Sequence, residues 1–324
     1  MWTARRLTGI LVALGAAAPA VADAAATRAD PPRPSLSAYH GLAAWVDIFD
    51  AGPWERPEQA VRGWARRDVR TVFVQTSNYR QRRAVHRPAM LARILASAHR
   101  RNMKVIAWYL PGFREPRRDW RRVKAAVHYR SPSGHRFDGF ALDIEATAVR
   151  DIATRNRRML ALSTRLRGLT DGRYAVGAII PDPVSQRYWP RFPYTQVRAR
   201  YDVILPMSYW TGHARGERPA YRHTRDALRL IRTRTGDPTV PIHVIGGIAS
   251  HASNAEVRGF ARAATAFLAT GASLYDAAIT TAGQWNQLSR IGRLRAREPA
   301  PIESSGGLRP RRGVGSISGP ERLG

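Results

Sequence analysis

Two carboxylates placed two positions apart are the residues of this sequence most suited to chemistry. Asp143 and Glu145 end the run of residues 137–145 (FDGFALDIE), which is otherwise mostly apolar. In a β-strand, residues two apart share a face, so both carboxylates point one way while Leu142 and Ile144 point the other. Two carboxylates this close cannot both ionise freely, so one of their pKa values rises and supplies a proton donor at neutral pH. The pattern predicts Glu145 as a general acid supported by Asp143; the alternative is a structural pair tied to arginines.

Eight short apolar runs, of which this is the fourth, predict the strands of the fold. They are residues 41–48, 69–75, 104–110, 137–145, 174–181, 202–209, 241–248 and 272–275. Helical periodicity follows at residues 57–67, 88–101, 117–129, 150–169, 221–235, 254–270 and 282–295, while residues 184–200 form the weakest helix. Apolar strands alternating with amphipathic helices indicate a parallel sheet covered on its faces. Eight such units predict an α/β fold, a single (β/α)8 TIM barrel. A Rossmann-type sheet is disfavoured because residues 49–54 (FDAGPW) make no glycine-rich phosphate loop.

The barrel prediction places function at the carboxyl ends of the strands and in the loops that follow them. Besides Asp143 and Glu145, the side chains expected there are polar or aromatic: Asp47, Gln75, Trp108, Tyr109, Asp182, Tyr209, Trp210, His251, Tyr275 and Asp276. Aromatic faces at such positions are candidate platforms for sugar rings. We therefore predict substrate contacts from Tyr209, Asp182, Trp210, Tyr275, Trp108, Tyr109, Asp47 and Gln75.

Three motifs fall on the fourth, sixth and eighth predicted strands. Residues 138–145 (DGFALDIE) match the pattern Asp-Gly-x-Asp-x-Asp-x-Glu at every fixed position but one, residues 205–210 (LPMSYW) contain Met-x-Tyr, and residues 271–276 read GASLYD. Together they resemble the family 18 glycoside hydrolases, the chitinases and endo-N-acetylglucosaminidases. The resemblance spans most of the barrel and rests on these three short segments.

The resemblance implies a retaining, substrate-assisted hydrolysis of β-linked N-acetylhexosamine glycans, either chitin-like or peptidoglycan. Glu145 would protonate the glycosidic oxygen while the substrate's own 2-acetamido carbonyl attacks the anomeric carbon. Asp143 would orient that acetamide, Tyr209 would donate a hydrogen bond to its carbonyl, and Asp182 would contact the sugar. The resemblance implies neither a metal ion nor a cofactor.

The sequence departs from the family pattern in three places. Ala141 stands where the family usually has another Asp, which removes a carboxylate that helps to hold the Asp143 proton. Tyr275 stands where the family usually has a tryptophan under the sugar ring, and residues 107–112 (AWYLPG) replace the family's Ser-x-Gly-Gly. These departures point to a distant relationship.

Other functions remain open on the sequence alone. A two-carboxylate hydrolase of another barrel family would pair Glu145 with Asp182 or Asp276, and a lysozyme of family 25 would use Asp47. A noncatalytic carbohydrate-binding barrel would use the strand-end aromatics without cleavage. His213 and His251 follow the sixth and seventh strands, but no histidine spacing is typical of a zinc site, so we expect loop surface there.

The composition of the chain and of its ends indicates where the protein acts and what it binds. Residues 1–24 read as a signal peptide for secretion or cell-wall association, 25–37 as a disordered linker, 38–297 as the barrel and 298–324 as a disordered basic tail. No later stretch is apolar enough to span a membrane, and with no cysteine the core alone must hold the fold. The charge of +29 is almost wholly scattered arginine. It indicates solvated helix faces or weak attraction to anionic wall polymers, without specific nucleic-acid binding.

Overall fold

The computed structural model of the protein describes residues 34–170, 172 and 174–291. The predicted signal peptide, the basic tail and residues 25–33 of the predicted linker lie outside the described residues. Within the predicted linker, Ser37 begins the short 3-10 helix η1 (Ser37–Tyr39). In the described part of the chain, no helix is long and apolar enough to cross a membrane.

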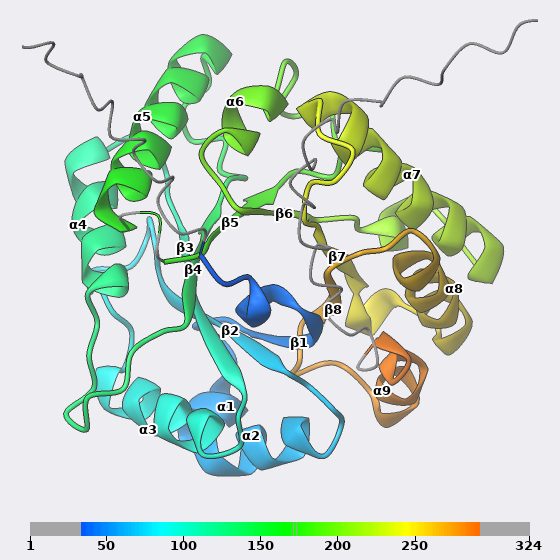
Figure 1. The fold of residues 1–324 in the computed structure, drawn as a ribbon, viewed down its shortest axis with the longest axis horizontal. Helices are drawn as coiled ribbons and strands as arrows, with labels where there is room; N and C mark the ends of the chain where they lie inside the picture. Colours follow the sequence, from blue (N-terminus) through cyan, green and yellow to red (C-terminus); the bar gives the residue numbers. More distant parts are fainter. Residues whose placement is uncertain (1–33, 171, 173, 292–324) are drawn as a thin grey trace, which may run out of the picture. The chain divides into compact units, whose positions relative to one another are not determined.

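Eight parallel strands form the barrel, and the predicted (β/α)8 fold is confirmed (Figure 1). They are β1 (Gly41–Val46), β2 (Thr71–Asn78), β3 (Lys104–Leu110), β4 (Gly139–Asp143), β5 (Val176–Ile180), β6 (Val203–Pro206), β7 (His243–Ile248) and β8 (Gly271–Tyr275). From β1 to β6 each strand pairs with the next in chain order, β7 pairs with β8, and β8 pairs with β1. Within the described residues, β6 and β7 are joined by two isolated bridges, Ile204 with Ile242 and Met207 with Ile245, so the barrel closes most weakly there.

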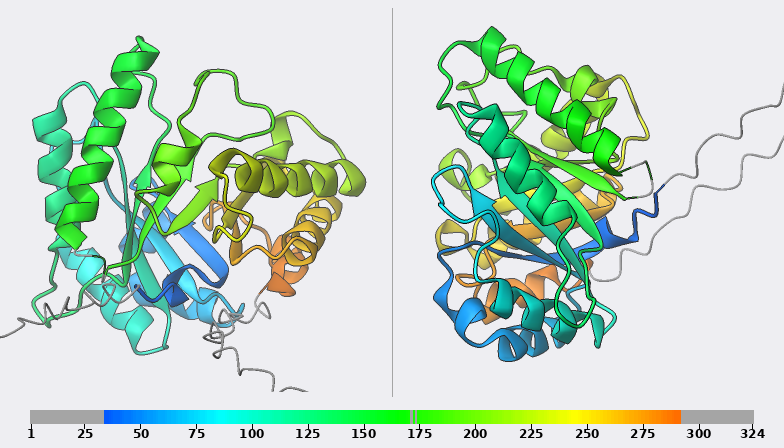
Figure 2. Two further views of the ribbon diagram at one scale, coloured as in Figure 1. Left: turned by 45° about the horizontal axis from the view of Figure 1, so that its top comes forward. Right: turned by 90° about the vertical axis from the view of Figure 1, so that its left-hand side faces the viewer.

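Helices surround the strands, as Figures 1 and 2 show. They are α1 (Ala51–Glu55), α2 (Pro57–Ala65), α3 (Pro88–His99), α4 (Pro116–Val127), α5 (Ile152–Thr170), α6 (Tyr194–Arg198), α7 (Glu217–Thr235), α8 (Asn254–Ala266) and α9 (Ala282–Leu288), with 3-10 turns η2 (Trp210–Gly212) and η3 (Ala249–His251). Local sequence explains where several begin: proline opens α2, α3 and α4, and capping boxes open α8 and α9. The weak fifth helix is confirmed as α6, which has five residues.

Buried apolar side chains form two separate clusters because neighbouring residues of each strand face opposite ways. The larger cluster lies between the strands and the helices, and the smaller one fills the barrel. Inside, the Trp45 and Phe73 rings stack with centroids 4.2 Å apart. At the amino ends of the strands, the hydroxyl of Tyr39 donates a 2.7 Å hydrogen bond to the carbonyl of Phe140. A Cβ at position 177 would lie 2.8 Å from the Tyr39 ring, so Gly177 leaves room for it.

The start of β8 is as tightly packed. A Cβ at position 271 would collide with the carbonyl oxygen of Tyr39 and lie 2.8 Å from that of Gly41, and backbone atoms cannot rotate away. We expect Gly271→Ala to lower the free energy of unfolding by about 1–3 kcal/mol, the usual cost of overpacking, as measured by urea denaturation. Gly168→Ala, in an open position on α5, is the matched control and should instead stabilise by about 0.5–1 kcal/mol. A Gly271→Ala variant as stable as wild type would contradict this packing.

Candidate active site

The carboxyl end of β4 directs its two acidic side chains toward the barrel axis. Asp143 and Glu145 line a cavity at the mouth of the barrel, whereas Leu142 and Ile144 belong to the cluster under the helices. The predicted alternation is therefore confirmed. The amide of Ile144 donates a 2.8 Å hydrogen bond to the carbonyl of Ile179, which continues the pairing with β5 past the last residue of β4. This hydrogen bond fixes the backbone that carries Glu145.

Two hollows meet at Glu145. The mouth cavity, of about 220 Å³, is lined by Trp45, Asp47, Phe49, Gln75, Asn78, Trp108, Leu110, Asp143, Glu145, Ile179, Met207, Tyr209, Ile245, Ile248 and Tyr275. The strand-five groove, of about 1090 Å³, is lined by Glu145, Thr147, Asp182, Val184, Ser185, Gln186, Arg187, Tyr188, Met207, Tyr209 and His213. Glu145, Met207 and Tyr209 are common to both. A chain molecule lying in the groove would therefore pass Glu145 where the mouth cavity opens.

Burial shapes the acidity of the carboxyl pair. Asp143 is only 5% exposed and its Oδ1 has no hydrogen-bond partner within the described residues. Burial, and then the charge of Glu145, raise the pKa of Asp143 well above its usual value. Burial also raises the pKa of Glu145. The pair therefore retains a proton at a higher pH than free carboxylic acids do, which is the state a general acid needs.

Two tyrosines face this pair. Burial, reinforced by the charges of Glu145 and Asp143, raises the pKa of Tyr209 well above its usual value, so its hydroxyl remains a hydrogen-bond donor. The ring of Tyr275 lies 6.4 Å from that of Tyr209, and its hydroxyl donates a 3.0 Å hydrogen bond to Oδ2 of Asp47. The structure thus brings Asp47, Tyr209 and Tyr275 together with the acidic pair, as the sequence predicted.

Indole rings form the floor of the mouth cavity. Trp108 was expected there; Trp45 was not, because it lies within a strand that is apolar throughout. A hydrogen-bond chain fixes Trp45: its Nε1 donates to the hydroxyl of Ser273 at 2.7 Å, and that hydroxyl contacts Nε2 of His243 at 3.0 Å. Burial lowers the pKa of His243 to about 4, so the imidazole is neutral. Trp45 and Trp108 meet edge to face.

Two aromatic residues predicted to contact substrate lie elsewhere. Tyr109 is fully buried under the helices, where its hydroxyl donates a 2.6 Å hydrogen bond to Asp119. Trp210 is likewise fully buried on the outside of the barrel, with its ring centroid 5.0 Å from that of Phe260. Both predictions were wrong. Tyr109 follows the inward-facing Trp108 in β3, and adjacent strand positions face opposite ways. Trp210 lies beyond the end of β6 and begins the 3-10 turn η2, where strand alternation no longer sets the direction of a side chain.

Exposed aromatics near the two hollows went unpredicted. Phe49 is 74% exposed at the rim of the mouth cavity, and Tyr188 is 43% exposed on the strand-five groove. Both lie in loops after strands, where strand periodicity gives no signal. Such aromatic faces suit stacking against sugar rings.

The remaining predicted polar residues are engaged in the protein's own hydrogen bonds. Gln75 lines the mouth cavity, and its Oε1 accepts a 3.1 Å hydrogen bond from the amide of Ile48. Asp182 lines the strand-five groove, where its Oδ2 contacts Nε2 of His223 at 3.0 Å and accepts from the hydroxyl of Ser185. Burial alone would raise the pKa of Asp182, but these hydrogen bonds lower it below its usual value. Asp182 therefore stays ionised and engaged.

The other residues singled out from the sequence lie outside the mouth cavity. His213 lines the strand-five groove and stacks parallel to His223, while His251 lines a separate surface hollow. Asp138, the first acid of the strand-four motif, lies at the amino end of β4. There it accepts a 2.9 Å hydrogen bond from the amide of Val105, so its role is to join strands.

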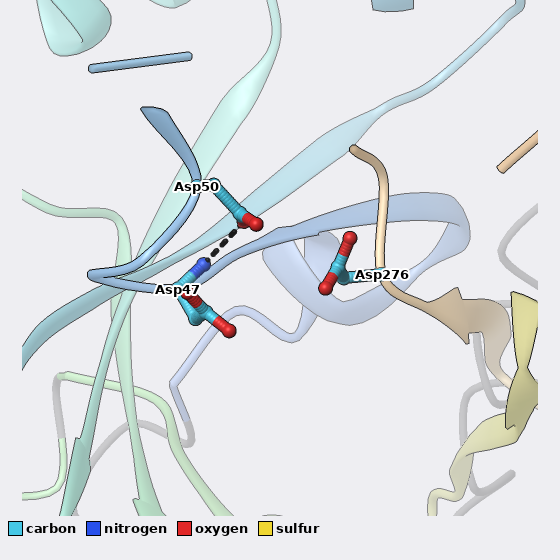
Figure 3. A group of neighbouring side chains, drawn as sticks. All are labelled: Asp47, Asp50 and Asp276. Carbon is cyan, nitrogen blue, oxygen red and sulfur yellow. Dashed lines mark hydrogen bonds between the residues drawn. The ribbon is translucent and has the colours of Figure 1, made fainter. Parts of the chain in front are cut away.

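Asp47, Asp50 and Asp276 form an acidic group at the ends of β1 and β8 (Figure 3), with carboxylate oxygens within 4.8 Å of one another. Oxygen ligands of this kind suit Ca²⁺ or Mg²⁺. Hydrogen bonds within the protein offer a different explanation for why these three carboxylates lie together. Asp50 accepts from the amide of Asp47 at 2.8 Å, and Asp276 accepts from the amide of Ala278 at 2.9 Å. Burial raises the pKa of Asp50 to about 7, which disfavours the charge that a metal ligand carries.

Comparison with known proteins supports the fold. No protein-family model matches the sequence, and no curated protein is significantly similar to it. Similar solved structures include an endo-β-1,4-mannanase from Thermotoga petrophila, with 8% identity and a TM-score of 0.61 over 79% of this chain and 77% of that one. The C-terminal domain of a putative chitinase from Desulfitobacterium hafniense has 11% identity and a TM-score of 0.57 over 78% and 99%. A family 18 N-acetylglucosaminidase from Paenibacillus barengoltzii has 12% identity and a TM-score of 0.52 over 79% and 100%.

Asp143 offers a test of the electrostatics. A carboxyl group whose pKa is raised by folding stabilises the protein below its ordinary pKa, and that contribution is lost as pH rises. Asn is uncharged at every pH, so Asp143→Asn should raise the free energy of unfolding at pH 7, on the order of 1 kcal/mol, with a smaller gain at pH 4. Denaturant titrations at the two pH values measure this difference. Glu55→Gln, on the exposed surface of α1, is the control and should show no such trend. An Asp143→Asn variant that is less stable at pH 7 would contradict the raised pKa.

Proposed function

We infer that the protein is a glycoside hydrolase that cleaves β-linked N-acetylhexosamine glycans with retention of configuration. The observation that carries this inference is the position of Glu145, whose half-buried side chain lies where the mouth cavity meets the strand-five groove. Asp143 and Tyr209, which belong to the motifs that resemble family 18, line the mouth cavity together with Glu145. The fold shared with solved structures named as chitinases and an N-acetylglucosaminidase is consistent with this function.

The first step breaks the glycosidic bond. The Glu145 carboxyl donates its proton to the glycosidic oxygen while the acetamide carbonyl oxygen of the substrate attacks the anomeric carbon and displaces the leaving sugar. The resulting oxazolinium ring is positively charged, and Asp143 lies in the same cavity to stabilise it. Tyr209 supplies a hydrogen bond to the acetamide oxygen, and the indoles of Trp45 and Trp108 with the Tyr275 ring provide the apolar floor.

The second step returns the proton. The Glu145 carboxylate takes a proton from water as the water attacks the anomeric carbon from the face that the leaving sugar vacated, and the oxazolinium ring opens. Two inversions give net retention. Ala141 provides no third carboxyl group, which agrees with the unpartnered Oδ1 of Asp143. In this protein Glu145 is therefore the acidic neighbour that tunes Asp143.

We also infer that the protein acts outside the cytoplasm, at or near the cell wall. The apolar stretch and small residues within positions 1–24 support export, and the arginine excess supports weak attraction to anionic wall polymers.

The direct test compares wild type with Glu145→Gln on chitin oligomers and on peptidoglycan glycan strands. The amide has no acidic proton to donate, so turnover should fall by about 10²–10⁴-fold with little change in folding. Glu55→Gln, on the exposed surface of α1, is the control and should retain full activity. Equal cleavage by wild type and Glu145→Gln would rule out the assigned acid. Binding of chitin by both without any cleavage would favour a noncatalytic carbohydrate-binding barrel.

A further inference from the structure

A third cavity, of about 440 Å³, lies beside the mouth among the loops that follow β2, β3 and β4. We call it the arginine pocket because three arginines line it: Arg114, which precedes α4, and Arg118 and Arg122, which belong to α4. Tyr79, Gly112 and Ala148 also line it. Nothing in the hydrolytic steps above uses these arginines. Their chemistry is that of a receptor for an anion.

Arg122 is the decisive member of the pocket. Its side chain is 97% buried, with 3% exposed, yet its Nη2 has no hydrogen-bond partner in the part of the chain that the structure describes. Its Nη1 makes one long contact, donating to the hydroxyl of Tyr109 at 3.4 Å. Leaving a charged donor buried and unpaired is costly, so an acceptor supplied by a ligand would satisfy it.

The charges around Arg122 leave the arginine pocket positive. Glu115 is paired with Arg118, whose Nη1 lies 3.0 Å from its Oε1. The oxygens of Asp119 accept from the Tyr109 hydroxyl at 2.6 Å and from the amide of Phe113 at 2.9 Å. Arg114 forms no ion pair with any described residue. Three guanidinium groups therefore face two carboxylates that are already engaged, and an anionic ligand would restore the balance.

The arginine pocket adjoins the mouth cavity through shared loop segments. Asn78 and Leu110 line the mouth cavity, while Tyr79 and Gly112 line the arginine pocket. The amide of Tyr79 donates a 2.9 Å hydrogen bond to the carbonyl of Leu110, which ties the two loops together. A Cβ at position 112 would lie 2.8 Å from the Tyr79 side chain, so Gly112 lets that aromatic residue pack close. The residues that line the arginine pocket follow β2, β3 and β4 or belong to α4, and those that line the strand-five groove follow β4, β5 and β6.

We propose that the arginine pocket is a subsite for a carboxylate-bearing sugar, so that the substrate is an anionic N-acetylhexosamine glycan, of the kind that contains muramic acid, and not neutral chitin. The proposal rests on the function inferred above. A guanidinium group binds a carboxylate through paired, charge-assisted hydrogen bonds. The 3-O-lactyl carboxylate of N-acetylmuramic acid supplies the charge, and its ring matches the N-acetylhexosamine of the mouth cavity.

The test measures binding of two monosaccharides to the full-length protein by calorimetry: N-acetylmuramic acid and N-acetylglucosamine, which differ only in the lactyl group. N-acetylmuramic acid should bind about tenfold more tightly, as a charge-assisted contact implies. Arg114→Gln and Arg122→Gln should each remove that preference. Arg121→Gln, on the exposed side of α4, is the matched control and should keep it. Arg114 is exposed, so the Arg114→Gln variant keeps the test valid if Arg122→Gln fails to fold.

Equal affinity for the two sugars in wild type would overturn the proposal. Inorganic phosphate that displaces N-acetylmuramic acid and binds more tightly than it does would also overturn it, since the arginine pocket would then be a general phosphate site. Neither result depends on cleavage. If wild type cleaves chitin oligomers but binds both sugars equally, the proposed function stands and the proposed subsite is ruled out. Preferential binding of N-acetylmuramic acid without cleavage of any glycan would support the subsite and contradict the proposed hydrolase function.

Discussion

The alternation of side chains along a closed parallel sheet is the constraint on which the whole site depends. Because successive residues of β4 face opposite ways, Asp143 and Glu145 are carried toward the barrel axis while Leu142 and Ile144 anchor the strand under the helices. The interior of the barrel is buried and rich in aromatic side chains, so the same geometry that gathers the carboxyl groups also raises the pKa of each. The alternation along β4 therefore accounts both for the position of the two carboxyl groups and for their raised pKa values.

The rest of the barrel holds this arrangement in place. Tyr39 closes the amino end through its hydrogen bond to Phe140, and the chain from Trp45 through Ser273 to a neutral His243 fixes the floor beneath the mouth. A rigid scaffold of this kind allows a carboxyl group to remain buried without a partner, at a cost in stability, which is a common feature of active sites. Asp143 carries that cost here.

Much of this could be predicted from the sequence, where short apolar runs located the strands and two-residue alternation gave the inward face of β4. Tyr209 and Tyr275 were predicted from their places at the carboxyl ends of the predicted strands and from the family resemblance. The alternation rule is not what identified them. The rule fails where aromatic residues are adjacent, because it cannot say which of Trp108 and Tyr109 faces inward. It also cannot single out Trp45 in an all-apolar strand, and loop residues such as Phe49 and helix residues such as Arg122 gain their roles only from tertiary contacts.

The central claim is that Glu145 keeps its proton to a higher pH than an ordinary glutamic acid does. Carbon-13 NMR of protein labelled at the glutamate carboxyl groups measures this directly, with Glu145→Gln identifying the signal by its absence. The account predicts one glutamate signal that titrates above the ordinary glutamate pKa of about 4.3 and disappears in the variant. A Glu145 signal that titrates at or below that value would contradict it.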